Sequence, residues 1–330
     1  MKKFYLILFH LVLINEINAQ NFLFLDPTAS SSFYNPAFTG GDTCTQIRNS
    51  TQLQSPGSYS WQFQNFLTVS QYLNKPNAWI GFGHLFDNKA DLIHYNQYSL
   101  FVAKPVYIKK NIIWTHGLQL SLLHQQHNNG QIFYGDQIDP RIGFVFDSGD
   151  NYPNYRSNFF LISYGTSFQY KNLLGGITLH NINHLGKNIA PKLIQFEADK
   201  DNKNYQSYLD VQLAYKLKLK IAGGELNTAL FSTGTFYVNA NPYIKAGLNF
   251  EWQQFRIQYS KRITESLDYN PFNSISFGYN GKSAGITYSF GWNNPQLKYG
   301  GTHQLSLLLK IRKVNSHADF KSKQNEIFIH

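Results

Sequence analysis

Apolar and polar side chains alternate along residues 205–220, which read YQSYLDVQLAYKLKLK. The odd positions, which include Leu209, Val211 and Leu217, are mostly apolar, and the even positions are mostly polar or charged. Successive side chains of a strand point to opposite faces, so this period of two predicts a strand with one apolar face. The stretch is much longer than the roughly 5–6 residues of an ordinary strand. We therefore expect long strands that close into a ring with the apolar face outward in lipid.

The same alternation, bounded by turn residues, recurs along the chain and predicts about fourteen strands. They cover residues 42–50, 58–72, 77–86, 95–106, 111–125, 158–171, 174–184, 204–218, 225–236, 242–251, 253–263, 273–280, 283–292 and 302–312. Leu308 interrupts the alternation in the last of them. The connections after even-numbered strands are short and those after odd-numbered strands are longer. This pattern is typical of outer-membrane barrels with short periplasmic turns and long external loops. The predicted fold class is all-β: a transmembrane antiparallel β-barrel of about 14 strands.

Composition favours a membrane barrel over a soluble domain. Aromatic residues make up 16% of the chain and charged residues only 15%, against a usual charged fraction of about 25%. No stretch approaches about 18 consecutive apolar residues, so the sequence predicts no transmembrane helix. In lipid every backbone polar group must be paired, which requires a closed barrel. A secreted β-sandwich is the soluble alternative, although the chain exceeds one such domain and shows no linker.

The two ends of the chain differ from the repeating middle. Residues 1–19 begin with lysines, continue with an apolar run too short to span a bilayer, and end at a small residue. We predict a secretory signal peptide there, in preference to a buried N-terminal helix, and hence export to the outer membrane. Pro27 and Pro36 break regular structure in the segment that follows. The predicted domains are 1–19, a signal peptide; 20–41, a periplasmic or plug segment; 42–312, the barrel; and 313–330, a polar tail.

The formal net charge of +10 is spread through predicted strands and turns. A nucleic-acid-binding protein would gather this charge on one face, so we expect no nucleic acid partner and favour a basic lumen or contact with outer-membrane lipid. The candidate inner-wall cations, which we interpret as solvated, are Lys216, Lys218, Lys220, Arg256 and Arg262. Cys44 is the single cysteine, which excludes an internal disulfide.

The sequence offers little catalytic or metal-binding chemistry. His180 and His184 lie four residues apart on one predicted strand, so they are about 13 Å apart and too distant to share a metal. His124 and His127 have no adjacent carboxylate or cysteine. No GxSxG, HExxH or phosphate-binding loop occurs. We predict a protein that is not an enzyme and has no catalytic residue, metal site or cofactor. A hydrolase site assembled from neighbouring strands is an open alternative.

One long loop, residues 130–157, carries several charged residues among aromatic ones. A loop of this length without periodicity usually serves a function such as partner binding. Asp136, Asp139 and Asp150 could bind Ca²⁺ through their oxygens, but their spacing is not that of an EF-hand. We interpret the stretch as a structured external loop, in which Asp136, Asp139 and Arg141 are candidates for partner binding.

Three stretches resemble the PorP/SprF family of Bacteroidota. Residues 34–40, YNPAFTG, resemble its N-P-A-[FY]-x-G signature, and residues 134–144, YGDQIDPRIGF, resemble its G-D-x-I-D-P-R-x-G-F loop. Residues 300–311, GGTHQLSLLLKI, resemble its closing strand. The order and spacing of these motifs agree over nearly all of the mature chain. The chain departs from the family pattern at Gln304, where a glutamate is usual, and at Trp61, which lacks the arginine of an R-x-Q-W motif.

The resemblance implies an outer-membrane barrel of the type IX secretion system. Members of the family act in secretion or surface attachment of cargo, including gliding adhesins, and some are linked to periplasmic lipoproteins that hold peptidoglycan. The residues that would carry partner binding are Asn35, Pro36, Phe38 and Gly40, together with Asp136, Asp139 and Arg141.

The functional prediction is therefore a non-catalytic barrel of the type IX secretion and gliding machinery. It would bind or anchor secreted cargo or a surface adhesin, and a periplasmic peptidoglycan-binding lipoprotein. The alternative is a passive transport barrel, either a porin or a channel for apolar solutes. The two differ at the lumen, because a porin conducts ions and a barrel plugged by its own N-terminus does not.

Overall fold

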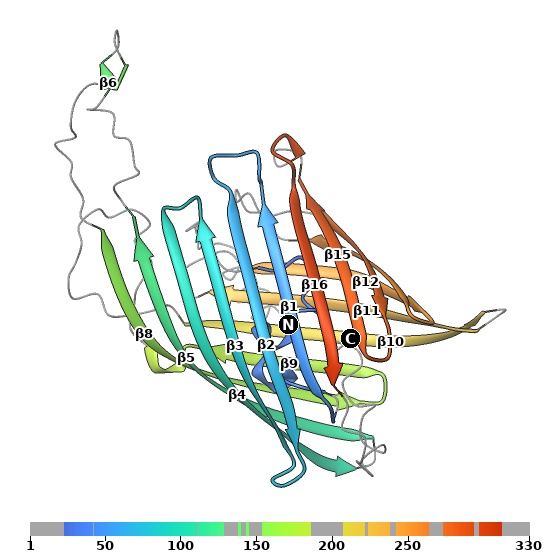
Figure 1. Cartoon of the computed structure of the whole chain (residues 1–330). Coiled ribbons are helices and arrows are strands. Elements are labelled where there is room, and N and C mark those ends of the chain that lie inside the picture. Colours follow the sequence, from blue (N-terminus) through green and yellow to red (C-terminus); the bar gives the residue numbers. More distant parts are fainter. Residues whose placement is uncertain are drawn as a thin grey trace, which may run out of the picture.

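The structure is a computed structural model of the chain. It describes residues 23–41, 43–109, 111–128, 138–139, 143–144, 154–185, 207–221, 224–237, 242–263, 273–293 and 297–311. Figure 1 shows long, tilted strands arranged as front and rear walls around a common interior. Within the described residues, no helix is long and apolar enough to cross a membrane.

Fourteen antiparallel strands close into one barrel. They are β1 (Thr45–Gln54), β2 (Gln62–Leu73), β3 (Ala78–Lys89), β4 (Ile93–Lys109), β5 (Ile112–His127), β8 (Tyr155–Tyr170), β9 (Leu173–His180), β10 (Tyr208–Ile221), β11 (Gly224–Tyr237), β12 (Tyr243–Trp252), β13 (Phe255–Arg262), β14 (Asn273–Asn280), β15 (Ala284–Trp292) and β16 (Thr302–Ile311). Each strand pairs with its neighbours in the chain, and β1 pairs with both β2 and β16. That last pairing closes the ring, so the first and last strands present no open edge to lipid.

The sequence-based prediction of a barrel with fourteen strands is confirmed, and the strand ends lie within four residues of those predicted. The placement of His184 on a strand was wrong. β9 ends at His180 because Asn181 adopts a left-handed backbone conformation, with φ of 58°, and a 3₁₀ turn, η4 (Ile182–His184), follows. The connection between β3 and β4 is also shorter than predicted, covering only residues 90–92.

A separate two-stranded sheet lies within the long connection from β5 to β8. It consists of β6 (Ile138–Asp139) and β7 (Gly143–Phe144), in which Asp139 pairs with Gly143. Figure 1 shows β6 beyond the rim of the barrel. The sequence predicted an external loop here and gave no sign of a hairpin.

The two faces of the wall have opposite chemistry. On β13, Phe255 and Ile257 point outward and are exposed, whereas Arg256 and Gln258 point inward and are buried. β10 repeats this arrangement, with Leu213 exposed to 52% and Gln212 buried. The apolar face is therefore outward, as the alternation predicted, where lipid rather than water would contact it.

An aromatic band marks the end of the barrel that carries the short turns. Its exposed members are Tyr107, Trp114, Tyr170, Trp252, Phe255 and Tyr279. Each lies close to the connection between β4 and β5, β8 and β9, β12 and β13, or β14 and β15. Aromatic rings of this kind lie at the headgroup level of a bilayer, so the band indicates one membrane interface.

Candidate functional site: the N-terminal segment in the barrel lumen

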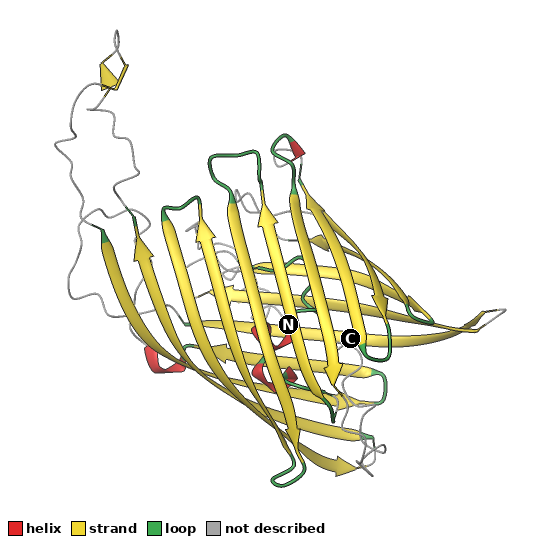
Figure 2. Ribbon diagram, in the orientation of Figure 1, coloured by secondary structure: helices red, strands yellow, loops and turns green. Residues whose placement is uncertain are grey.

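Residues 23–41, here called the lumenal segment, contact the inner face of the barrel. The segment contains two short helices, α2 (Ser31–Tyr34) and η1 (Pro36–Phe38). Figure 2 shows short helices between the front and rear walls, and η1 contacts β4, β5 and β8. The two prolines that break regular structure lie one before α2 and one at the start of η1.

A buried ion pair anchors the beginning of the lumenal segment. Nη1 of Arg256 on β13 lies 3.0 Å from Oδ2 of Asp26, and the two side chains are only 2% and 0% exposed. Nη2 of Arg256 donates to Oδ1 of Asp26 at 3.2 Å, and Nε donates to Asn249 at 2.8 Å. The backbone N–H and the hydroxyl of Thr28 also donate to Asp26, at 3.0 and 2.6 Å. The carboxylate thus has the several partners that a buried charge requires.

These partners decide the protonation state of Asp26. Burial raises the pKa of the carboxyl, but the charge of Arg256 and the hydrogen bonds from Thr28 and Arg256 outweigh burial and lower its pKa below the ordinary value. Asp26 is therefore ionised at neutral pH. Burial raises the pKa of the Tyr34 hydroxyl well above its ordinary value, so Tyr34 remains a neutral donor.

The backbone around Asp26 is held by three further side chains from separate strands. Gln304 on β16 accepts the N–H of Asp26 at 3.0 Å. Gln52 on β1 accepts the N–H of Leu25 at 2.9 Å, and Lys245 on β12 donates to the carbonyl of Leu25 at 2.5 Å. Because β12 lies apart from the neighbouring strands β1 and β16 in the ring, the contacts fix the start of the segment in position. Gln304 supplies this acceptor without adding a second negative charge beside Asp26.

The middle of the segment is held on the other side of the barrel by Asn35. Its Oδ1 accepts the N–H of Ala37 at 2.9 Å, which caps η1. Its Nδ2 donates to the carbonyl of Thr166 on β8 and to Gln212 on β10, both at 3.2 Å. The side-chain amide of Asn35 thus shapes the turn of residues 35–38, here called the NPAF turn, and attaches it to two strands. These contacts are a physical reason for asparagine at this position.

Glycines in the wall provide the space that the NPAF turn occupies. A Cβ atom on Gly117 of β5 would lie 2.2 Å from the backbone nitrogen of Ala37. A Cβ atom on Gly165 of β8 would lie 2.2 Å from Oδ1 of Asn35. Any side chain at either position would displace the segment, so these glycines serve close approach of two backbones rather than curvature of the wall.

A second buried polar group surrounds the carbonyl of Tyr34. Nε2 of His180 lies 3.2 Å from this carbonyl and 3.0 Å from Oδ2 of Asp210 on β10. The ring of Tyr208 stacks on His180 with centroids 4.3 Å apart. The imidazole N–H therefore holds the segment and Asp210 together. No hydrogen bond joins His180 to a serine hydroxyl in the described residues, so a catalytic triad is not assembled here.

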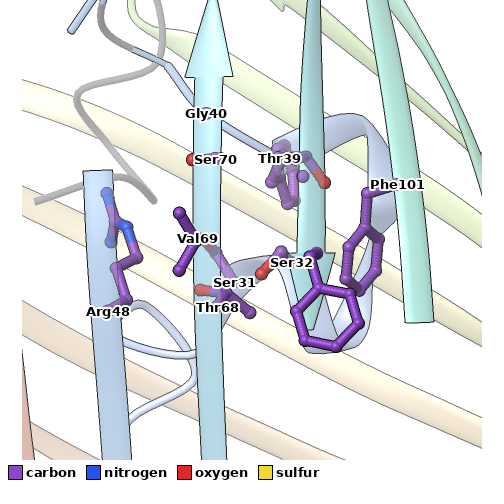
Figure 3. Close-up of a pocket in the computed structure, with 12 residues that line it drawn as sticks. Ser31, Ser32, Thr39, Gly40, Arg48, Thr68, Val69, Ser70 and Phe101 are labelled. Atoms are coloured by element: carbon purple, nitrogen blue, oxygen red, sulfur yellow. The ribbon is translucent and has the colours of Figure 1, made fainter. Parts of the chain in front are cut away.

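A small polar pocket separates part of the segment from β1 and β2. Figure 3 shows Ser31, Ser32 and Thr39 facing wall residues that include Arg48 and Thr68. The described lining residues carry hydroxyls, one guanidinium and several apolar side chains, and none of them is a carboxylate, imidazole or thiol. None of these described residues is a base that could activate a serine.

The structure places the partner-binding candidates of the first motif against the wall. Asn35, Pro36, Phe38 and Gly40 are all buried, and a Cβ atom on Gly40 would lie 2.1 Å from the ring of Trp79. A partner could contact these residues only if the segment left the wall. In the second motif, Asp139 lies on β6, and Asp136 and Arg141 lie outside the described residues.

The interpretation of two inner-wall cations as solvated was wrong. Arg256 is a buried ion-pair partner, and Arg262 is 2% exposed with its guanidinium 5.8 Å from the centroid of the Tyr243 ring. The importance of Asp26 was missed; its one sequence signal is the Asp-Pro-Thr triplet, in which an aspartate accepts hydrogen bonds from residues just after it. The described residues contain no group of three histidine, cysteine, aspartate or glutamate side chains that could hold a metal ion.

The closed strand ring, the lipid-facing apolar surface and the aromatic band define an outer-membrane β-barrel. A sequence model of the family described as type IX secretion system membrane protein PorP/SprF matches residues 18–309. The chain therefore belongs to the PorP/SprF family of type IX secretion system membrane proteins. A search of curated proteins finds no match.

Solved structures of similar fold are outer-membrane proteins of low sequence identity. Omp33 of Acinetobacter baumannii has a TM-score of 0.46 at 8% identity, covering 83% of this chain and 100% of that one. The Pseudomonas putida toluene transporter TodX has a TM-score of 0.45 at 8% identity, with coverage of 90% and 99%. A FadL homologue of Pseudomonas aeruginosa has a TM-score of 0.44 at 10% identity, with coverage of 86% and 94%.

Proposed function

We propose that the protein is a non-catalytic component of the type IX secretion and gliding machinery, and that it binds or anchors secreted cargo and periplasmic partners. The observation that carries the proposal is the buried ion pair between Asp26 and Arg256, which holds the lumenal segment inside the barrel. A barrel filled by its own N-terminus is suited to presenting surfaces rather than to conducting solutes.

The burial of the inner wall supports a closed lumen. Inward-facing residues are also buried on β14 and β15, for example Ser276 and Ser289. In a water-filled pore such side chains would be accessible to solvent. This burial favours partner binding over the alternative function of a passive porin or channel for apolar solutes.

We infer the partners from the family and from the two motifs. We propose that the loop containing Asp136, Asp139 and Arg141 contacts secreted cargo or a surface adhesin at the external side. We propose that the segment containing Asn35 and Phe38 becomes available to a partner when it leaves the wall. On the periplasmic side, a peptidoglycan-binding lipoprotein would contact the short turns.

Export is part of the same proposal. Residues 1–19 would direct the chain through the inner membrane and be removed. The mature protein would then insert into the outer membrane with its short turns in the periplasm. Residues 313–330 would form a tail at that side.

Two measurements on one preparation test the proposed function. The tagged protein is purified from outer membranes in mild detergent, co-purifying proteins are identified by mass spectrometry, and the same sample is studied in planar bilayers. We expect a secreted protein or a periplasmic lipoprotein to co-purify, and no steady ion conductance. A barrel that purifies alone and conducts steadily would be a transport protein, and the proposal would be rejected.

A further inference from the structure

The outward face of the barrel carries a row of polar residues where apolar ones are expected. Lys104 on β4 pairs in register with His116 on β5, which pairs in turn with Thr166 on β8. Figure 1 shows these three strands side by side. Lys104 is exposed, and so are Val102 and Val106, its neighbours on the same face. A cation thus stands within an apolar, lipid-facing stretch of strand.

The row lies just inside the aromatic band at the short-turn end. Trp114, a member of that band, is two residues before His116 on the same face of β5. On the other side of Lys104, the pairing of β3 with β4 stops at Trp79 and Ala103. Lys104 is therefore level with Ala78, the first residue of β3 after the turn from β2. This position corresponds to the boundary between headgroups and acyl chains in one leaflet.

His116 is held rigidly beside Lys104. Its Nδ1 lies 2.6 Å from the hydroxyl of Tyr164, and its ring lies 4.8 Å from the ring of Trp114. Nε2 has no hydrogen-bond partner in the described residues, and we assign the histidine proton to it, with the tyrosine O–H donating to Nδ1. The ammonium of Lys104 likewise has no carboxylate partner among the described residues. The two donors come from paired positions on adjacent strands, whose backbones lie roughly 5 Å apart in a sheet. Both face lipid without an acceptor in the described residues.

We propose that Lys104 and His116 bind the phosphate of a phospholipid in the leaflet at the short-turn end. A phosphate diester at this depth supplies the anionic oxygens that both donors require, and its acyl chains would lie along Val102 and the other apolar residues of the same face. An ionisable residue on a lipid-facing surface is costly unless it meets such a partner. The site is independent of the proposed function, since it lies on the outside of the wall.

In the experiment, the full-length protein in neutral detergent is titrated with dioleoylphosphatidylglycerol. Native mass spectrometry measures the fraction of protein that has bound lipid at each concentration. We expect Lys104→Gln to weaken lipid binding at least about fivefold, as expected from loss of one charge-assisted hydrogen bond. Lys261→Gln is the matched control, because Lys261 also points outward but lies one residue from the end of β13. The control is expected to bind within about twofold of wild type.

Further variants and probes separate the possible outcomes. Lys104→Arg retains the charge and should retain binding, and His116→Phe, which keeps a ring but removes the donor, should weaken it. Heat-dependent mobility in gels shows that each variant is folded. Equal lipid binding by Lys104→Gln and Lys261→Gln would mean that Lys104 only extends towards water, and would overturn the proposal. Displacement of the lipid by inorganic phosphate would also overturn it, in favour of a site for soluble anions.

Discussion

At the scale of single residues, Asp26 determines how firmly the lumenal segment is held. Its carboxylate is fully buried against Arg256. Replacement by asparagine would leave the guanidinium buried without a counter-charge, so we expect Asp26→Asn to lower the free energy of unfolding by roughly 3–5 kcal/mol. Thermal unfolding in detergent measures the effect. Asp91→Asn, on the exposed connection between β3 and β4, is the control and should change stability by less than about 0.5 kcal/mol.

Asp26 also makes the stability of the folded protein depend on pH. A carboxyl whose pKa is lower in the folded than in the unfolded protein adds stability above its unfolded pKa, near 3.9, and this stability is lost as pH falls through the folded value. The lowered pKa of Asp26 therefore predicts constant anchoring between about pH 7 and pH 5 and weakening below about pH 4. Unfolding temperatures of wild type and Asp26→Asn, measured over this range, should converge at low pH. Parallel curves at all pH values would show that Asp26 is not the titrating anchor.

At the scale of elements, η1 can lie close to the wall because glycines there have no side chain. Gly117→Ala would place a methyl group 2.2 Å from the backbone of Ala37, so we expect overpacking to cost roughly 1–3 kcal/mol and to expose the lumenal segment. Limited proteolysis of the N-terminus, read by mass spectrometry, measures this exposure. Gly175→Ala on β9 is the control, because its methyl group would meet nothing closer than 4.0 Å. Equal protection of both variants would contradict close packing of the turn.

The elements also show how far the sequence could predict the structure. Alternation identified β10 and β13 because each side chain on a barrel wall meets either lipid or the lumen, a local property with a period of two. It could not identify the partner of Arg256, since Asp26 is 230 residues away. It also could not distinguish a solvated inner wall from a filled one, because both are polar. Leu308, which broke the alternation, faces inward and is buried.

At the scale of the whole molecule, closure of the ring depends on β1 pairing with β16. Ser50 and Ser306 are directly opposite each other there, with their hydroxyl oxygens 3.0 Å apart. We expect Ser50→Cys with Ser306→Cys, in a Cys44→Ser background, to form a disulfide that changes the mobility of the unfolded chain in gels. Ser50→Cys with Ser289→Cys is the control and should not cross-link, because β15 is not a neighbour of β1. Cross-linking of the control alone would disprove the strand order.

The contacts of Asp26 also constrain the order in which parts of the chain can reach their folded positions. Its backbone N–H bonds to a residue 278 positions later, on the strand that closes the ring. The lumenal segment therefore cannot complete this contact until β16 is in place. Contacts of such long range form late in folding. We expect a chain truncated before β16 to lack this contact and to leave the lumenal segment more accessible to proteases than in the complete barrel.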